Sequence, residues 1–317
     1  MEINEIIAVP SPHTPDECPF CPKPKQEPFT TYPGGSAASG TKLGSIMADP
    51  PSMEGGARPK DGEANRQGKA SPKPRPNPPL THPDFDRPDG SVILSGPFSY
   101  EAHHLIPGKE TMLKGEGSGT VMDGHKIEEW IIGGKGKITA DSGYTINNSD
   151  NGVWLPSAPE NLKKLRGRPR TTPWEREGHP KPHPAALTED EKELLAFYAM
   201  EHGAGQFHYG KHAISDETGA YKSYPAEVNK ILSELYDRIN LWSNECPLCG
   251  KAKGNPPPPY DPHWKVHDLL DLVSMLIEIY IRLEPPSRWE FFISTHAMNK
   301  SKADRKKLSP AQAPKSF

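Results

Sequence analysis

Two pairs of histidines are the residues whose type and spacing best suit chemistry in this chain of 317 residues. His103 and His104 are adjacent in EAHHLIPGKE. Because adjacent side chains of a strand point to opposite faces, we expect a strand edge or bend where this pair can converge. His208 and His212 lie in FHYGKHAI. If that segment is helical, both imidazoles share one face and can chelate a metal ion.

The reaction that such histidines suit is hydrolysis of a phosphodiester. One imidazole can bind a divalent ion while another stays uncoordinated and takes a proton from water, because its ordinary pKa lies near neutral. The ion stabilises charge on the phosphoryl and leaving oxygens. YTINNSDNGVWLP lies between the two pairs, and its asparagines could orient a histidine through the second ring nitrogen. Mg²⁺, Mn²⁺, Zn²⁺ or Ni²⁺ could occupy such a site.

Four cysteines form two nearly identical knuckles, and the sequence holds no others. Cys18 and Cys21 lie in ECPFCPK, and Cys246 and Cys249 lie in ECPLCGK. Two CxxC pairs predict one structural, tetrahedral Zn²⁺ site, and independent redox pairs or disulfides are the alternatives. A shared ion would act as a clamp that closes a very long loop and stabilises a chain with little apolar material.

Composition divides the chain into four parts. We expect an N-terminal zinc knuckle at 1–21, a low-complexity linker at 22–90, a folded domain at 91–299 and a disordered basic tail at 300–317. The linker is rich in Pro, Gly, Ser and Lys, as in PKPRPNPP, and such a composition cannot bury enough apolar area to offset the entropy of ordering.

Periodicity predicts the main elements of the folded domain. A short strand is expected at Val153–Leu155. Apolar residues at 3–4–7 spacing predict a helix at about 225–242, and an apolar stretch predicts another at about 263–283. Thr188 and Glu191 form a capping-box pattern before a further helix. These helices would cover the site and supply most of the core.

Charge and hydropathy exclude two classes of protein. The net charge of -3 argues against binding nucleic acid through a basic field over the whole molecule, so a local basic patch or a metal ion would have to supply positive charge. The most apolar stretch, 266–283, contains four charged residues, which favours a soluble helix over a membrane span. No signal peptide is visible in the first residues, so we expect a soluble protein whose export would need no cleaved signal.

Three blocks in order carry a resemblance to a known family. AHHLIPGK is followed by GYTINNSDNGVWLPS and then by HYGKH with YPAEVNKIL. Over about residues 91–240 this order and wording resemble the AHH family of the HNH/endonuclease VII superfamily, nuclease domains common at the C-terminal ends of bacterial polymorphic toxins. The resemblance implies an α+β fold with a ββα-metal core, in which two strands and a helix hold one divalent ion.

The resemblance also implies a role for each matching residue. His103 would be a metal ligand and His104 the general base. Asn151 would be the central asparagine that orients the base, and Asn147 in the same block is a weaker candidate. His208 and His212 would complete the metal site. About fifty residues separate NGVWLP from HYGKH, which is more than the compact family pattern has, and His202 is therefore a rival for one of the closing roles.

The function that follows is a metal-dependent endonuclease, with DNA favoured as substrate and little dependence on its sequence. The family setting implies an antibacterial toxin that is made in the bacterial cytoplasm, acts in the cytoplasm of the target cell and is blocked by a cognate immunity protein. Endonuclease VII-type nucleases also bind zinc through cysteines near the active site, which agrees with the two knuckles. An RNase of the same fold and a non-catalytic, zinc-scaffolded binding protein are the alternatives.

Overall fold

The structure is a computed structural model that describes residues 34–49, 72–76, 99–113, 124–134, 137–139, 141–142, 144–157, 200, 206–208, 222–245, 264–283 and 291–307. By their contacts the residues fall into two compact units, and each is described by itself. Unit 1 comprises Met1–Pro74, His104–Val153 and Pro225–Ile279. Unit 2 comprises Arg75–His103, Trp154–Tyr224 and Tyr280–Phe317.

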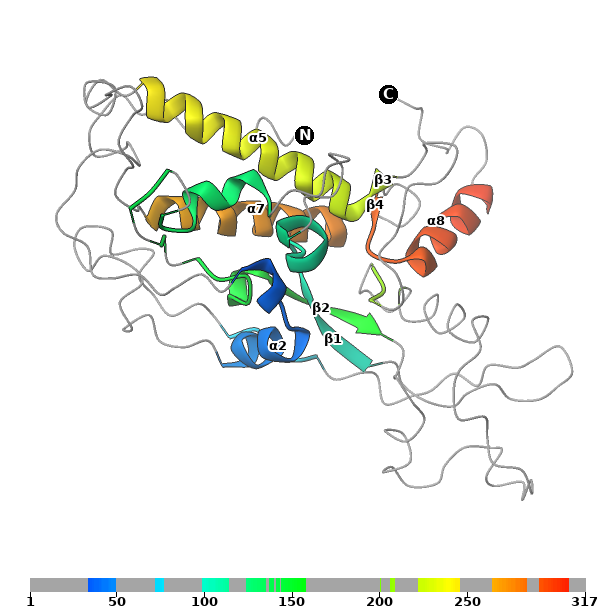
Figure 1. The fold of residues 1–317 in the computed structure, drawn as a ribbon. Coiled ribbons are helices and arrows are strands. Elements are labelled where there is room, and N and C mark those ends of the chain that lie inside the picture. The colour runs from blue at the N-terminus through cyan, green and yellow to red at the C-terminus, as the bar shows by residue number, and fades with distance from the viewer. Residues whose placement is uncertain are drawn as a thin grey trace, which may run out of the picture. The chain divides into compact units, whose positions relative to one another are not determined.

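Helices and two small two-stranded sheets make up the described part of the chain (Figure 1), in agreement with the expected mixture of α and β structure. The elements in chain order are η1 (Gly35–Ala37), α2 (Gly40–Ala48), β1 (Ser99–His104), η3 (Gly108–Leu113), η4 (Lys126–Trp130), η5 (Ser149–Asn151), β2 (Gly152–Ser157), β3 (Lys222–Ser223), α5 (Tyr224–Glu245), α7 (Trp264–Leu283), β4 (Phe291–Phe292) and α8 (Thr295–Lys307).

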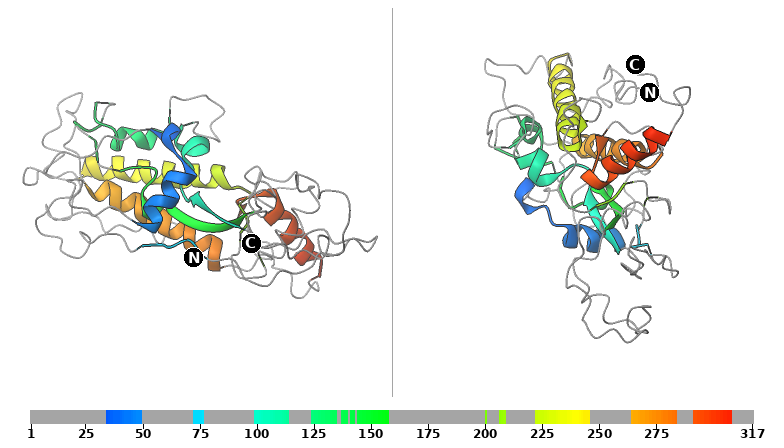
Figure 2. Two further views of the ribbon diagram at one scale, coloured as in Figure 1. Left: turned by 90° about the horizontal axis from the view of Figure 1, so that it is seen from below. Right: turned by 90° about the vertical axis from the view of Figure 1, so that its right-hand side faces the viewer.

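The two long helices, α5 and α7, confirm the helices predicted at about 225–242 and 263–283. They lie alongside each other in Figure 1 and in the left view of Figure 2. Helical spacing places apolar residues on one face of each helix, and these residues are buried. The buried residues are Val228, Ile231, Leu232, Leu235 and Ile239 on α5, and Val266, Leu270, Val273 and Ile277 on α7.

The sheets are short. Strand β1 pairs with β2, which contains the strand predicted at Val153–Leu155 and confirms it. In unit 2, β3 pairs with β4 in parallel, with Lys222 opposite Phe291 and Ser223 opposite Phe292. Both histidines of the AHH sequence lie within β1, and the chain bends directly after them, at residues 105 and 106.

The prediction of a linker at 22–90 is wrong in part, because residues 34–49 contain η1 and helix α2. Ser39 caps α2 by accepting a hydrogen bond from the Lys42 N–H through its hydroxyl. Leu43 and Met47, four residues apart, are completely buried on one face of that helix. The low apolar content of the whole stretch conceals this short amphipathic helix, since only two large side chains need to be buried to dock it.

The prediction of a disordered tail at 300–317 is also wrong for its first residues, because helix α8 continues to Lys307. The Ser294 hydroxyl accepts a hydrogen bond from the Ala297 N–H at the start of this helix. Ala297 and Ser301 are completely buried four residues apart, which gives α8 an inner face despite its many basic residues. Charge composition alone therefore does not distinguish this helix from a solvated tail.

Several expectations fall outside the described residues. These are the four cysteines of the two knuckles, His202, His212 and the capped helix that follows Thr188. Within the described part of the chain, none of the helices combines the length and apolar character that crossing a membrane requires.

His125 is a buried cap in unit 1. Its Nδ1 accepts a hydrogen bond from the Ile127 N–H at 3.0 Å, at the start of η4. Its Nε2 lies 3.3 Å from the hydroxyl oxygen of Ser233 on α5. Burial lowers the pKa of His125 from 6.5 to about 4, although a backbone hydrogen bond with Asn229 acts in the opposite direction. The ring is therefore neutral in the folded protein near pH 7, and its Nδ1 can accept.

We expect acid to destabilise the protein through His125. Because its folded pKa lies below its ordinary value, the unfolded chain binds the proton more readily, so this stabilisation is complete above about pH 6.5 and is lost as the pH falls toward 4. Between about pH 7.5 and 4.5, urea titration should show roughly 2 kcal/mol more loss of unfolding free energy in the wild type than in His125→Asn. Equal losses in the two proteins would contradict this role.

Candidate active site

His104, the last residue of β1, lies against the side-chain amide of Asn147. The Nε2 atom of His104 is 3.0 Å from the Oδ1 atom of Asn147, and both residues belong to unit 1. His104 is half-buried, whereas Asn147 is completely buried. An oxygen at this distance orients the imidazole ring, as a partner on the second nitrogen of a working histidine must.

The asparagine that contacts His104 differs from the one that the family resemblance implies. Asn151 is expected to orient the base, with Asn147 as the weaker candidate, but Asn147 is the one that contacts His104. The side-chain hydrogen bonds of Asn151 all go to other residues. Sequence spacing alone could not tell which asparagine contacts His104, because both side-chain amides belong to the same turn.

Asn151 is completely buried, and its side chain makes four hydrogen bonds. Its Oδ1 accepts from the Ile106 N–H at 2.7 Å and from the Ser274 hydroxyl at 3.0 Å. Its Nδ2 donates to the Ile146 carbonyl at 2.9 Å and to the Ile106 carbonyl at 3.3 Å. Four is the full capacity of a primary amide. Asn151 thus fastens the chain that follows the histidine pair to the turn that precedes β2.

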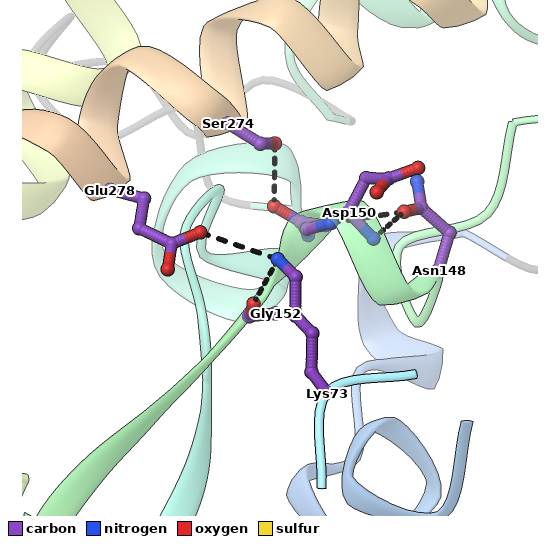
Figure 3. Close-up of polar contacts among 7 residues, drawn as sticks. Lys73, Asn148, Asp150, Gly152, Ser274 and Glu278 are labelled. Carbon is purple, nitrogen blue, oxygen red and sulfur yellow. Dashed lines mark hydrogen bonds and ion pairs between the residues drawn. The ribbon is translucent and has the colours of Figure 1, made fainter. Parts of the chain in front are cut away.

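Helix α7 supports the same turn with polar side chains. The Ser274 hydroxyl reaches Asn151, and Asp271 accepts a hydrogen bond from Asn148 Nδ2 at 3.1 Å (Figure 3 draws the Ser274 bond and labels Asn148). Asn148 in turn caps η5, since its Oδ1 accepts from the Asp150 N–H at 2.7 Å and the Asn151 N–H at 2.9 Å. Asp271 and Ser274 are three residues apart, so they share one face of the helix.

Lys73 joins that face of α7 to the start of β2. Its ammonium lies 3.0 Å from the Gly152 carbonyl oxygen and 3.3 Å from the Glu278 carboxylate. Figure 3 draws both contacts as dashed lines. Its backbone N–H donates to the Met47 carbonyl at the end of α2. The side chains of Lys73 and Glu278 are both partly exposed, so the ion pair adds little to the free energy of unfolding and mainly fixes the position of the Lys73 ammonium.

Unit 2 brings together two of the predicted metal ligands. The rings of His103 and His208 meet edge to face, with their centroids 4.9 Å apart. His103 is 2% exposed, and the ring of the buried Tyr224 lies 5.5 Å from it. Glu101 Oε2 is 3.4 Å from His208 Nδ1. Burial raises the pKa of Tyr224 well above its ordinary value of 10, so its hydroxyl stays protonated.

The segment that carries His208 is held on both sides within unit 2. The His208 N–H donates to the Pro156 carbonyl of β2 at 2.7 Å. Gln206 accepts a hydrogen bond from the Ile293 N–H, just after β4. The ring of Phe207 meets His296 of α8 at right angles, with centroids 5.9 Å apart. The segment 206–208 is therefore held by β2 and by the residues that follow β4.

The donors of this cluster fit a divalent ion by their chemistry. Imidazole nitrogens and a carboxylate oxygen suit Zn²⁺, Ni²⁺ or Mn²⁺. Within the ranges that the structure describes, no three His, Cys, Asp or Glu side chains are close enough to form a complete metal site. His103 and His208 thus supply two donors of an incomplete set, with the Glu101 carboxylate beside His208, and His212, the other predicted ligand, lies outside the described residues.

Glu101 and Ser274 are site residues that sequence reasoning missed. A signal for Glu101 was present, because residues two apart on a strand share a face and Glu101 stands two before His103. No local signal points to Ser274, since it lies more than 120 residues from its partner Asn151. Only the packing of α7 reveals it.

We expect Asn151→Ala to destabilise the protein far more than Ser274→Ala. Removing the amide leaves buried N–H and carbonyl groups of residues 106 and 146 without partners, at roughly 2–4 kcal/mol, whereas Ser274→Ala removes one of two donors to an oxygen, at about 1 kcal/mol. Chemical denaturation of both variants measures the difference. Similar small losses would show that the buried amide does not fasten the turn.

Comparison with known proteins adds one match. No curated protein and no solved structure matches this chain. The family model AHH, described as a nuclease family of the HNH/ENDO VII superfamily with conserved AHH, matches residues 93–195. The matched segment contains His103, His104, Asn147 and Asn151, together with the paired strands β1 and β2. Residues 93–195, about a third of the chain, are therefore identified as similar to the AHH nuclease family of the HNH/ENDO VII superfamily.

Proposed function

We propose that this protein is a metal-dependent endonuclease that hydrolyses phosphodiester bonds in DNA with little sequence preference. The observation that carries the proposal is the contact of His104 with Asn147, a histidine held by a buried amide within a segment of a nuclease family. A histidine oriented in this way is suited to act as a general base. The same fold acting on RNA is the alternative.

His104 is the proposed base. Its ring is half-buried and is held through Nε2, so the other ring nitrogen would accept a proton from the attacking water. Asn147 keeps the ring in place during this transfer. Asn151 acts at a distance, because it fixes the backbone of Ile106, two residues after the base. The proposed core is of the ββα-metal type, with β1 and β2 as its strands.

His103 and His208 are the proposed ligands of the divalent ion, with His212 as a further one. The Glu101 carboxylate, 3.4 Å from His208 Nδ1, would accept the proton of that nitrogen and so leave Nε2 to bind the ion. When bound, the ion would supply charge stabilisation at the phosphoryl and leaving oxygens. Mg²⁺, Mn²⁺, Zn²⁺ and Ni²⁺ are all candidates.

The proposed biological role follows from the family. A nuclease of this kind would act as an antibacterial toxin inside a competitor, and the producing cell would need an immunity protein that covers or blocks the site. Nucleic acid and that immunity protein are the partners that we propose.

We expect purified protein to cleave plasmid DNA with Mg²⁺, Mn²⁺, Zn²⁺ or Ni²⁺ and to stop when EDTA is added. His104→Ala should lower the rate roughly 10²- to 10⁴-fold, the usual contribution of a general base. His183→Ala, which changes a histidine outside the proposed set, is the matched control and should keep the wild-type rate. Agarose gels of plasmid and of total RNA, run in parallel, measure both substrates.

Three other outcomes of this cleavage assay would contradict the proposed mechanism or favour an alternative function. Full activity in His104→Ala would refute the proposed mechanism. Cleavage of RNA in preference to plasmid would favour the RNase. No cleavage of either nucleic acid with any of the four ions would favour a non-catalytic, zinc-scaffolded binding protein.

We also propose that the four cysteines bind one structural zinc ion, although they lie outside the described residues. Two matching CxxC knuckles provide the four thiolates of a tetrahedral site. A site formed in this way would join the N-terminal segment to the segment after α5, and its free energy of binding would add to that of folding.

We expect about one zinc ion per chain by elemental analysis of the purified protein. If both knuckles share the ion, the double variant Cys18→Ser/Cys21→Ser should lose all of it, and so should Cys246→Ser/Cys249→Ser. Loss of only half of the metal in each double variant would indicate two separate sites. Absence of zinc together with oxidised cysteines would contradict the proposal.

A further inference from the structure

Residues 34–49 dock against η3 and η5 of unit 1, the turns that lie near His104 and Asn147 in the sequence, although they precede the matched segment at 93–195. Helix α2 contacts η5, and η1 contacts η3. Two glycines lie at this interface. A Cβ atom on Gly152 would collide with Met47 and Leu43 of α2, and one on Gly35 would collide with the Gly108 carbonyl oxygen. These close approaches show a fitted interface between the two segments.

The backbone of this N-terminal segment fixes the amide of Asn147. The Ser39 N–H donates to Asn147 Oδ1 at 3.0 Å, and Asn147 Nδ2 donates to the Ala37 carbonyl at 3.0 Å. A backbone N–H can only donate and a carbonyl can only accept, so only one of the two orientations of the amide satisfies both. The oxygen of Asn147 therefore faces His104.

The orientation of that amide determines which nitrogen of His104 carries the proton. Oδ1 can only accept, so Nε2 of His104, 3.0 Å away, must donate. In the neutral imidazole the lone pair then lies on Nδ1. A reversed amide would face the ring with a donor instead, and the lone pair would move to Nε2.

We infer that residues 34–49 are a positioning element of the nuclease site, which acts through Asn147 to set the tautomer of His104 with its basic lone pair on Nδ1. Asn147 is then a positioning residue, and the Ala37 carbonyl and the Ser39 N–H are the groups that hold it. The inference rests on the proposed function for its catalytic meaning, but the tautomer itself can be measured without any nuclease assay.

The direct test is the nitrogen-15 spectrum of histidine-labelled full-length protein, recorded without added metal at about pH 8, above the ordinary pKa of imidazole. A long-range proton–nitrogen correlation distinguishes the two tautomers, and His104→Gln identifies the signal by its loss. We expect the tautomer protonated on Nε2 in the wild type. The tautomer protonated on Nδ1 would overturn the inference, whatever the activity of the protein.

Variants then test the part played by the N-terminal segment. Ser39→Pro removes the N–H that holds the amide, and Asn147→Leu removes the amide itself. Each should turn the His104 signal into a mixture of tautomers and lower kcat roughly 10- to 100-fold, with KM changed less than about twofold. Ser45→Ala, on the exposed side of α2, is the matched control and should change neither the spectrum nor the rate.

The outcomes separate this inference from the proposed function. An unchanged His104 signal in folded Ser39→Pro and Asn147→Leu would overturn the inference even if the wild type is an active nuclease. The wild type could also show the expected tautomer, and the variants its loss, without any nuclease activity. That result would support the positioning contact and refute the proposed nuclease function. If a variant does not fold, the wild-type spectrum still decides.

Discussion

A buried primary amide must find partners for two donor hydrogens and two acceptor lone pairs, and Asn151 finds all four within unit 1. Its partners belong to the bend after β1, the turn before β2 and helix α7. No apolar side chain could replace this set, because the backbone groups of Ile106 and Ile146 would lose their hydrogen bonds in a buried place. The path of the chain on leaving the histidine pair depends on this one side chain.

Around this amide, several residues that are distant in sequence each hold a different part of the same turn. Asp271 holds Asn148, Ser274 holds Asn151, and Glu278 acts through Lys73 on Gly152. The spacing of the three residues on α7 follows the helical repeat, so one rigid face matches three successive parts of the turn. A turn held from a regular helix keeps its geometry better than one held by other loops, which suits a site that must be positioned within fractions of an ångström.

Much of the fold could be predicted from the sequence, because α5 and α7 have long apolar repeats and β2 has turn residues before a short apolar run. The order of the AHH block and the HYGKH block also led to His103 and His208, whose rings do meet. Helix α2 could not be predicted, since two buried side chains in a Pro- and Gly-rich stretch do not change its average composition. Nor could the contact of His104 with Asn147 in place of Asn151, because the direction of the Asn147 amide is set by Ala37 and Ser39, far away in the sequence.

The hydrogen bond from the His208 N–H to the Pro156 carbonyl has a consequence for how such domains can diversify. The chain leaves the end of β2 and returns to it about fifty residues later, so both ends of that excursion are fixed at one point. Doubling the length of a closed loop costs only about 0.6 kcal/mol of chain entropy. Whole elements can therefore be inserted or removed between these two anchors during evolution while the returning histidine keeps its place.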